Sequence, residues 1–465
     1  MQKTSSSVSN ENLSVIGRRP IIAIVGAGSL NWGRSIVLDF LLNPDFAEAE
    51  IRLLDVLPDR LALVHEWCEF ACRRLGGKQR IRACTDLREG LRDVTACLSA
   101  ISVGGDRLWR YDATHPHLDG IFQPVGDTTG PGGALRALRH APAMQKIGQT
   151  LAEVGSRGAV LVQLTNPLNA LTASLEGIPG IRVFGFCHGY DDTERVIATA
   201  LFRKPHEQEA LRGANWRQAL PEVRVELAGN NHFVFIDKLR VGDRDYTQET
   251  LYELTPEIFD CPFREAVWSR YGAIPGNYPR HPIEFLSGFI DHRSGYGRQW
   301  GVDPVASEIN PLNGERHDSS RTYLESVLAA ARKDFEATAA WPVRHSREPV
   351  DAIVAAFHTG AQLDVHLNLR NQGAVQGVSD DLHLEMFCRI EDGKVHRPTV
   401  SFPEKINREI ERVGRSQLEL AACCQNYDFD RLMESLKADP LMPADPSVGR
   451  RLLREMVDFQ KEWIL

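Results

Sequence analysis

A cysteine and two histidines offer the most specific chemistry in the sequence. Cys187 and His188 follow the strand pattern 182–186, and His232 follows the alternating run 223–227. A thiolate and an imidazole can share one soft or borderline divalent ion, and two protein ligands leave the ion open to substrate oxygens. Cys187 and His232 therefore predict a catalytic metal site. The competing interpretation is a buried cysteine and a histidine that caps a neighbouring element.

A glycine-rich turn follows the first apolar run, 20–25. Gly26 and Gly28 allow a tight turn whose amides approach a pyrophosphate at a helix N-terminus. Asn31 stands where the usual G-x-G-x-x-G pattern has its third glycine. Asp55 ends the next strand pattern and is placed to accept hydrogen bonds from an adenosine ribose, which favours NAD over its phosphorylated form.

The order of the elements around these residues predicts how they are positioned. Short apolar runs alternate with helical patterns through the first 190 residues, which indicates parallel βαβ units in a doubly wound sheet. After residue 190 the helical stretches lengthen, and residues 363–390 alternate like antiparallel strands. We expect an α/β protein with an N-terminal Rossmann-like sheet and an interleaved C-terminal α+β domain. The predicted parts are a flexible tail at 1–18, an NAD-binding domain at 19–190 and a substrate, metal and oligomerisation domain at 191–465.

The apolar and helical patterns predict individual strands and helices. The strands are expected at 20–25, 51–54, 95–101, 159–164 and 182–186. The helices are expected at 35–42, 193–211, 321–336, 404–424 and 447–463.

Composition excludes several classes of protein. The chain has 465 residues, 43% of them hydrophobic, with 54 Lys+Arg against 62 Asp+Glu and a net charge of −8. This argues against disorder and against nucleic acid or an anionic membrane as the main partner. No apolar run is long enough to span a bilayer, and the polar N-terminus lacks the apolar core of a signal peptide, so we expect a cytoplasmic protein. The nine cysteines are too dilute for a disulfide scaffold and are expected to be free thiols.

Five motifs occur in an order that resembles family 4 of the glycoside hydrolases, and the resemblance covers roughly residues 20–400. They are Gly26-x-Gly28-Ser29, Asp127-Thr128-Thr129-Gly130-Pro131-Gly132-Gly133, Thr165-Asn166-Pro167-Leu168, Cys187-His188-Gly189-Tyr190 and Gly229-x-Asn231-His232-Phe233. A further, weaker match to the family is Asn371-x-Gly373 in the C-terminal half. The resemblance implies an NAD-dependent glycosidase that departs from the usual pair of catalytic carboxylates.

The chemistry implied by the resemblance is oxidation followed by elimination. NAD takes hydride from the sugar C3, a base removes the C2 proton, the glycosidic oxygen leaves, water adds and the hydride returns. A divalent metal, usually manganese, stabilises the enediolate. Oxidation makes an otherwise very weak C–H acid removable, and the metal stabilises the developing oxyanion.

The resemblance also assigns roles to individual residues. Cys187 and His232 match the metal ligands, and Asn166 matches a residue that touches substrate and nicotinamide. Arg110 matches a substrate-binding arginine, and Asp127 an acid that helps the base. The predicted cofactor contacts are Gly26, Gly28, Ser29, Asp55 and Asn166.

His188 matches the proton donor to the leaving group in members that have Cys-His. Members acting on 6-phosphosugars have Cys-Asp or Cys-Asn there, so a non-phosphorylated α-glycoside is expected. Cys187-His188-Gly189 resembles the α-glucuronidases and α-glucosidases, and we expect an α-glucuronide. An α-glucoside, α-galactoside or α-galacturonide is the alternative.

The sequence departs from the family pattern at the expected base. Related sequences carry an aspartate where this chain has Pro279. Tyr278 is the predicted substitute, as in branches with a tyrosine base, and packing in a Pro-rich loop is its alternative role. Arg280 and His281 are expected to meet a uronate carboxylate, with surface placement as the alternative.

Two other classes of function remain open. A lactate/malate-type dehydrogenase shares the expected fold, and Asp192-Thr193-Glu194-Arg195 offers its D-x-x-R spacing, although Asp191 and Glu194 also suit a helix cap. A non-enzymatic NAD sensor would need the glycine turn but not Cys187 and His232. The family resemblance further implies a homodimer or homotetramer.

Overall fold

A computed structural model describes residues 13–202, 222–247, 250–254, 261–291, 295–302, 312–335, 345–346 and 348–464. Its strands are β1 (Ile21–Val25), β2 (Glu50–Leu54), β3 (Arg80–Cys84), β4 (Ala96–Ser99), β5 (Ala159–Gln163), β6 (Ile181–Gly185), β7 (Val223–Asn230), β8 (Phe233–Val241), β9 (Arg244–Tyr246), β10 (Leu363–Arg370), β11 (His383–Glu391) and β12 (Lys394–His396). Its α-helices are α1 (Trp32–Leu42), α2 (Pro58–Arg74), α3 (Leu87–Leu91), α4 (Gly105–Thr114), α5 (Gly130–Val154), α6 (Leu168–Ser174), α7 (Gly189–Leu201), α10 (Pro262–Tyr271), α11 (Leu312–Lys333), α12 (Val350–Thr359), α13 (Glu404–Gln425), α14 (Phe429–Ser435) and α15 (Pro446–Ile464).

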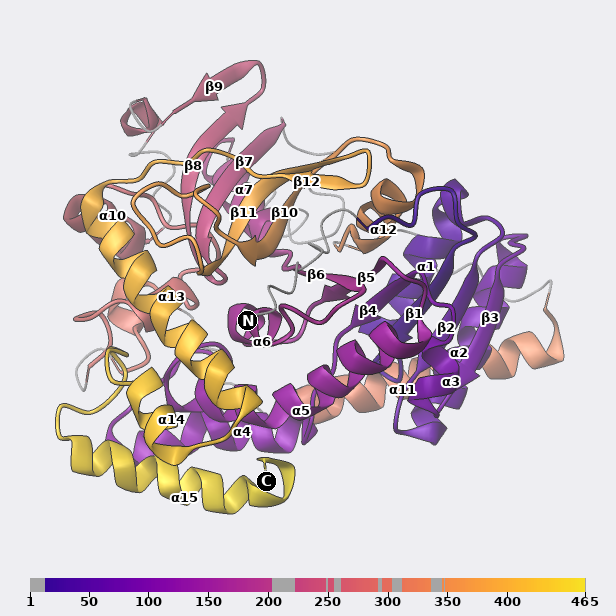
Figure 1. The fold of residues 1–465 in the computed structure, drawn as a ribbon, viewed down its shortest axis with the longest axis horizontal. Coiled ribbons are helices and arrows are strands. Elements are labelled where there is room, and N and C mark those ends of the chain that lie inside the picture. Colours follow the sequence, from indigo (N-terminus) through magenta and orange to yellow (C-terminus); the bar gives the residue numbers. More distant parts are fainter. Residues whose placement is uncertain are drawn as a thin grey trace, which may run out of the picture.

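The described strands form one sheet in the order β3-β2-β1-β4-β5-β6-β10-β11-β7-β8-β9, with β12 paired to β11 (Figure 1). The pairs from β3 to β6 are parallel, and the later pairs are antiparallel. The predicted doubly wound sheet is therefore confirmed, and each of the five predicted strands is present. The sequence did not predict β3. This edge strand contains alternating arginines and has no apolar run.

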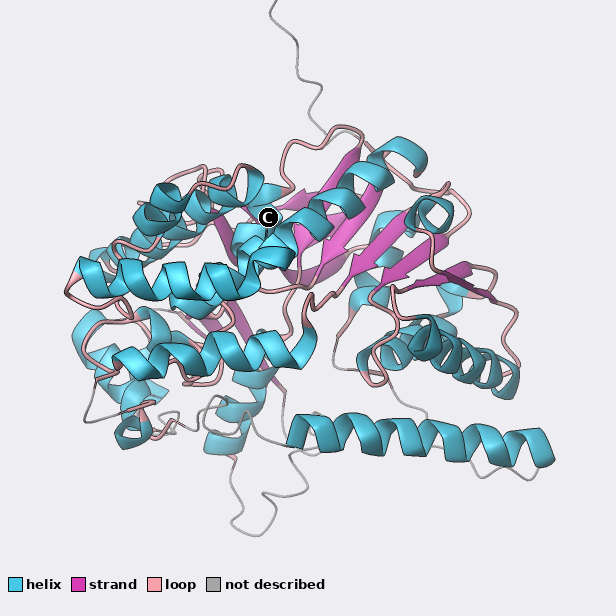
Figure 2. Cartoon of the chain, turned by 90° about the horizontal axis from the view of Figure 1, so that it is seen from below, coloured by secondary structure: helices cyan, strands magenta, loops and turns pink. Residues whose placement is uncertain are grey.

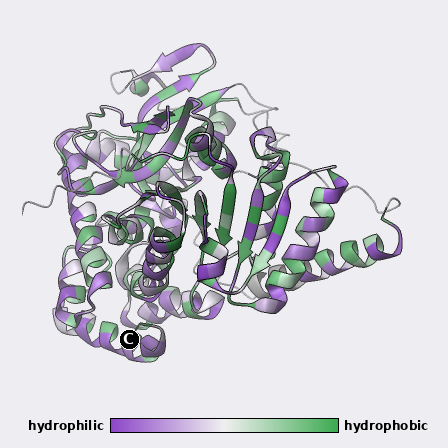
Figure 3. Ribbon diagram, turned by 45° about the vertical axis from the view of Figure 1, so that its right-hand side comes forward, coloured by the Kyte–Doolittle hydropathy of each residue, from purple (hydrophilic) through white to green (hydrophobic). Residues whose placement is uncertain are grey.

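Helices cover both faces of the parallel strands, as expected of a doubly wound sheet (Figure 2). Ile22 and Ile24 of β1 belong to one buried cluster, whereas Ala23 and Val25 belong to a second one on the opposite face. Successive side chains of a strand point to opposite faces, so a strand that is apolar throughout must be covered twice. Figure 3 shows these central strands mostly in green, the hydrophobic end of its scale.

The C-terminal half continues the N-terminal sheet. Asn368 of β10 pairs with Gly185 of β6, and α13, α14 and α15 form a further apolar cluster against α5 (Figure 1). The two halves are therefore interleaved, as predicted. The proposed boundary at residue 190 falls inside α7, which begins at Gly189.

The later predicted elements are also present, with shifted bounds. The helix expected at 193–211 begins four residues early, and its second half lies outside the described residues. The other three long helices correspond to α11, α13 and α15, and the alternating segment forms β10 and β11. None of the helices described is long and apolar enough to cross a bilayer.

Most of the predicted tail, 1–18, falls outside the described residues. Its last part is packed: Val15 is fully buried, and the Gly17 N–H donates to the His358 carbonyl at 3.0 Å. A free tail extending to residue 18 is therefore wrong for residues 13–18, because an apolar side chain there enters the core.

Candidate active site

The glycine-rich turn after β1 leaves no room for side chains at its first two glycines. A Cβ at Gly26, where φ is +90°, would lie 2.1 Å from the Ala100 carbonyl oxygen. A Cβ at Gly28 would lie 2.7 Å from the carboxylate of Asp55, which accepts the Gly28 N–H at 2.8 Å. The backbone and Asp55 thus form a cradle at the start of α1 that fits a dinucleotide, with its pyrophosphate at the helix and its ribose at Asp55.

The glycine missing from position 31 has a substitute two residues later. A Cβ at Gly33 would lie 2.3 Å from the Ala27 carbonyl oxygen, so Gly33 allows α1 to pack closely against the turn. Ser29 Oγ accepts the Trp32 N–H, the first of α1, at 3.2 Å. The departure from the usual pattern is therefore a shift in spacing rather than a loss of close packing.

Cys187 and His232 face each other at the strand ends. Cys187 follows β6, and His232 lies with Asn231 in the two-residue turn between β7 and β8, where its φ is +66°. The distance from Cys187 Sγ to His232 Nε2 is 3.6 Å. A sulfur and a nitrogen bound to one divalent ion at about 2.3 and 2.1 Å with a tetrahedral angle lie about 3.6 Å apart, so the pair fits a shared metal.

The other ring nitrogen of His232 is held in a way that sets its tautomer. Thr128 Oγ1 lies 2.9 Å from His232 Nδ1 and donates to Asp127 Oδ1 at 2.6 Å. Because the Thr128 hydrogen goes to Asp127, Thr128 must accept from Nδ1–H. The lone pair of Nε2 then points toward Cys187, as expected of a metal ligand with an oriented second nitrogen. Asn166 Nδ2 donates to Asp127 Oδ2 at 3.0 Å, which fixes the carboxylate from its other side.

His281 lies in the same donor cluster. Its ring centroid is 4.2 Å from that of His232, and one ligand atom each from Asp127, His232 and His281 lie within 4.8 Å of one another. Burial and the neighbouring His232 hold the pKa of His281 well below its usual value. Its imidazole is therefore neutral at pH 7 and carries a lone pair, which makes it a third candidate ligand as well as a candidate substrate contact.

The charges of the cluster depend on what occupies it. Burial raises the pKa of the Cys187 thiol well above its ordinary value, and Glu385 adds to this shift. Burial lowers the pKa of His232, which keeps the imidazole neutral. Burial alone would raise the pKa of Asp127, but the positive charge of Arg136 and the hydrogen bond from Thr128 hold it below its usual value. A bound cation would lower the pKa of the Cys187 thiol again, because it favours the thiolate.

Two buried carboxylates hold the loop that presents Asp127. Glu284, which follows His281 in the short helix η6 (Pro282–Phe285), accepts the Val125 and Gly126 N–H groups at 2.7 and 2.9 Å. Asp439 accepts the first N–H of α5 at 2.8 Å. Burial raises the pKa of Glu284 to about 8. The sequence patterns did not single out either residue.

His188, the predicted proton donor, has a carboxylate partner that the sequence analysis missed. His188 Nδ1 lies 3.1 Å from Glu348 Oε1, and the His188 side chain is 39% exposed. Ser346 Oγ accepts the Glu348 N–H at 3.0 Å, and the Ser346 N–H donates to Asp39 of α1 at 2.6 Å. The segment carrying Glu348 is thus fastened to the helix that follows the glycine turn. Glu348 lies 160 residues from His188 in the chain, so no local pattern could reveal the pair.

Tyr278, the predicted base, lies in the segment between α10 and η6 that also carries His281. The guanidinium carbons of Arg195 and Arg280 lie 5.4 and 5.1 Å from the centre of its ring. The buried Arg280 Nε has no hydrogen-bond partner among the described residues, so its N–H is free to donate to a ligand oxygen. The role of Tyr278 as base remains a prediction.

Gly189, on which the subgroup prediction depends, has a packing role. A Cβ there would lie 2.5 Å from Asn277 Nδ2. Asn277 is buried, with φ at +64°, and its N–H donates to Thr193 Oγ1 at 2.6 Å. The glycine after His188 therefore accommodates the segment that carries Tyr278.

Arg110 lies on α4 and is partly buried. Asp112 on the same helix pairs with Arg139 of α5 at 2.8 Å and accepts from Gln460 at 2.6 Å. These buried contacts fix α4 against α5 and α15. The predicted contact between Arg110 and substrate remains a prediction.

The fold and the site together define a class: a Rossmann-type enzyme fold with a thiol–imidazole centre at its strand ends. The sequence-family model described as "Family 4 glycosyl hydrolase" matches residues 21–202, and the sequence-family model of the family's C-terminal domain matches residues 227–442. The chain belongs to family 4 of the glycosyl hydrolases. Membership of this family confirms the α-glycosidase activity expected from the sequence, without specifying the sugar. The dehydrogenase alternative is not favoured.

Several relatives with assigned names match nearly the full length of the chain. An alpha-galacturonidase of Thermoanaerobacterium saccharolyticum is 25% identical over 95% of this chain and 96% of its own. An alpha-galacturonidase of Bacillus subtilis is also 25% identical, over 94% of this chain and 96% of its own. An alpha-galactosidase of Rhizobium meliloti is 24% identical over 95% of this chain.

Solved structures confirm the fold. A Bacillus subtilis protein described as a glucosidase superposes with a TM-score of 0.79 at 23% identity, over 94% of this chain and 99% of that chain. A 6-phospho-alpha-glucosidase from gut microorganisms, in complex with NAD and Mn2+, has a TM-score of 0.76 at 16% identity, over 96% of this chain and 99% of that chain.

Proposed function

We propose that this glycosidase hydrolyses an α-linked uronide, with an α-glucuronide as its substrate. The observation that carries the proposal is the opposed pair Cys187 and His232, with the second nitrogen of His232 fixed through Thr128. A two-carboxylate glycosidase has no use for such a pair, whereas a metal-assisted oxidation and elimination does.

The proposed cofactors are NAD and a divalent metal, with manganese as the first choice. The turn at Gly26 and Gly28 and the Asp55 carboxylate would hold NAD, and Cys187 and His232 would hold the metal, with His281 as a further donor. When bound, NAD supplies a reversible hydride acceptor for the sugar C3, and the ion supplies positive charge for the neighbouring sugar oxygens.

The side chains of the protein then have separate tasks. Tyr278 removes the C2 proton, and His188 donates a proton to the glycosidic oxygen as its bond to C1 breaks. Glu348 orients His188 through Nδ1, which leaves Nε2 to face the leaving group. Asp127, held by Thr128 and Asn166, positions His232. Water then adds to C1, a proton returns to C2, and the product sugar regains its hydrogen at C3.

A uronate is favoured over a neutral sugar by the charge beside this cluster. Arg280 has a buried N–H that no described residue satisfies, and a carboxylate is the group that an arginine binds best. Two full-length relatives are named alpha-galacturonidases. Cys187-His188-Gly189 favours the glucuronide over the galacturonide, since Cys-His-Ser or Cys-His-Glu is more typical of galactose-configured substrates.

The decisive experiment compares four aryl substrates, an α-glucuronide, α-galacturonide, α-glucoside and α-galactoside, with NAD, Mn2+ and a reducing agent. We expect the highest kcat/KM for the α-glucuronide, no net NADH, and exchange of the C2 hydrogen with deuterated solvent. A preference for the galacturonide would refute the sugar assignment while keeping the uronide. Turnover without C2 exchange would refute the elimination mechanism.

Arg280→Gln tests recognition of the carboxylate. Loss of a charge-assisted hydrogen bond, worth about 1.5–3 kcal/mol, should lower kcat/KM for uronides about 10- to 150-fold. The matched control is Arg270→Gln, an exposed arginine at the end of α10. Equal losses on uronides and neutral glycosides would show that Arg280 acts on the structure and not on the substrate carboxylate.

A further inference from the structure

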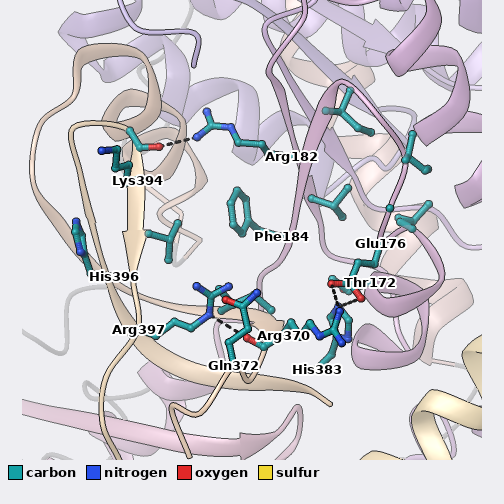
Figure 4. A pocket seen from close by; sticks show the side chains of 18 residues that line it. Thr172, Glu176, Arg182, Phe184, Arg370, Gln372, His383, Lys394, His396 and Arg397 are labelled. Carbon is teal, nitrogen blue, oxygen red and sulfur yellow. Dashed lines mark hydrogen bonds and ion pairs between the residues drawn. The ribbon is translucent and has the colours of Figure 1, made fainter. Parts of the chain in front are cut away.

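A cavity lies apart from the predicted active site. It has a volume of about 360 Å³ and occupies the space where β6 diverges from β10, β11 and β12, next to the end of α6 (Figure 4). None of its lining residues belongs to the metal, acid or cofactor sites. The volume is in the range of small-molecule pockets, which is about 300–1,000 Å³.

The lining of this cavity is strongly cationic. Four of the lining side chains are positively charged, and only Glu176 is acidic. The cations are Arg182, Arg370, Lys394 and Arg397. Glu176 lies 3.6 Å from Arg370, so it compensates one of the four. Such a concave positive surface on a chain of net charge −8 concentrates anions.

Arg182 is the independent observation that points to a ligand. It is only 5% exposed, and Glu176, the acidic residue in the lining, lies beside Arg370 and His383 instead. One terminal nitrogen donates to the Gly393 carbonyl at 2.6 Å, and the guanidinium carbon lies 4.7 Å from the centre of the Phe357 ring. The Nε and the other terminal nitrogen have no hydrogen-bond partner among the described residues. Burial lowers the pKa of Arg182 to about 10, which leaves it charged at pH 7. A buried charge without a counter-ion is costly, and an anion in the cavity would satisfy it.

The cations lie at two ends of the cavity. Figure 4 shows Arg182 and Lys394 on one side of Phe184, and Arg370, Arg397 and Gln372 on the other. An ion with one negative charge can bind at only one of the two cationic ends, whereas a molecule with several anionic oxygens can bind at both.

We propose that this cavity binds a small multivalent anion, a phosphate ester or a polycarboxylate, at a site distinct from the active site. The ligand places anionic groups against Arg182 at one end and against Arg370 and Arg397 at the other. Arginine suits both phosphate and carboxylate oxygens because its planar donors can bind two of them at once.

Calorimetric titration of the full-length, NAD-saturated protein tests the proposal, with inorganic phosphate, pyrophosphate and citrate as probes at constant ionic strength. We expect one site per chain, with pyrophosphate or citrate binding at least about tenfold more tightly than phosphate. Preference between pyrophosphate and citrate separates a phosphate ligand from a carboxylate ligand.

Two opposite variants locate the site. The double variant Arg370→Gln and Arg397→Gln should weaken binding about tenfold or more, whereas Glu176→Gln should strengthen it because it removes the only lining acid. All three side chains are partly or largely exposed, so the fold should tolerate the changes. Lys437→Gln, an exposed change just after the end of α14 and outside the cavity, is the control.

Three outcomes would overturn the proposal. The first is no saturable binding of any probe up to about 10 mM. The second is binding that neither variant changes, which would place the anion elsewhere. The third is a change in oligomeric mass in the arginine variant without anion binding, which would make the cavity a contact between subunits.

Discussion

The cofactor turn and the metal–acid centre lie at the same edge of one sheet, but they are built differently. The turn comes from a short stretch, Gly26 to Gly33, and from Asp55 at the end of the neighbouring strand. The centre combines Asp127, Cys187, His232 and His281, which are scattered over 155 residues. In the turn the backbone excludes side chains. In the centre, side chains orient one another through hydrogen bonds.

This difference has a consequence for substitutions. A change in the turn acts by steric exclusion and should affect cofactor affinity first. A change in the centre removes a donor or misorients one, and should affect turnover while leaving the cofactor in place.

The largest expected effect is that of Cys187→Ser. A hydroxyl is a far poorer ligand than a thiolate for a borderline metal, so kcat should fall about 10³-fold or more while NAD affinity stays unchanged. Steady-state kinetics and NAD titration give the two values. Cys424→Ser, on α13 and away from the site, is the control. An active Cys187→Ser enzyme would remove the cysteine from the metal site.

Gly28→Ala should have the complementary effect. Its Cβ would lie 2.7 Å from the Asp55 carboxylate, which must move away from the ribose position. NAD affinity should fall about 10- to 100-fold, or about 1.4–2.8 kcal/mol, with kcat at saturating NAD much less affected. Gly449→Ala is the control, since its Cβ would crowd the flexible end of Met442 and lie at ordinary contact distance from Pro443. A loss of kcat with unchanged NAD affinity would contradict the contrast between the two regions.

Glu348→Gln should have a smaller effect, confined to proton donation by His188. The amide keeps an oxygen near His188 Nδ1 but loses the charge that stabilises an imidazolium, so kcat should fall about tenfold for alkyl glycosides. Aryl glycosides with good leaving groups need little acid assistance and should lose much less. Equal losses on both kinds of substrate, or a change in NAD affinity, would indicate a structural role through Ser346 and Asp39.

The smallest expected effect is on stability, through Glu284. Its pKa of about 8 in the folded protein lies above the ordinary value of 4.5, so the stability that it contributes is complete below about pH 4.5 and is lost as the pH rises through 8. Glu284→Gln keeps an oxygen for the Val125 and Gly126 N–H groups and cannot ionise. Its Tm should therefore exceed that of the wild type by a few °C at pH 9, with little difference at pH 5.

Thermal denaturation across that pH range checks this prediction. The exposed Glu404 provides the control as Glu404→Gln, which should leave the pH dependence unchanged. A Tm difference that is the same at pH 5 and pH 9 would show that Glu284 does not titrate in this range.

The sequence by itself determined the parallel sheet and the cofactor turn. Apolar runs of strand length and glycines at fixed offsets are local signals, because a strand buried on both faces and a turn against a helix constrain consecutive residues. Even there, only the structure showed that Gly33 takes the packing role of the glycine expected at position 31. The edge strand β3, exposed and rich in arginine, gave no such signal.

Only the tertiary structure decided how the chemistry is assembled. The sequence singled out Cys187, His188 and His232, but not the relay through Thr128, the nearness of His281 or the pairing of His188 with Glu348. It also did not indicate the cavity around Arg182, whose lining comes from β6, β10 and β12. Hydrogen bonds and charge pairs between side chains depend on distance in space, and the sheet brings together strands that are far apart in the chain. Local patterns predicted the residue types, and the folded sheet determined which of them meet.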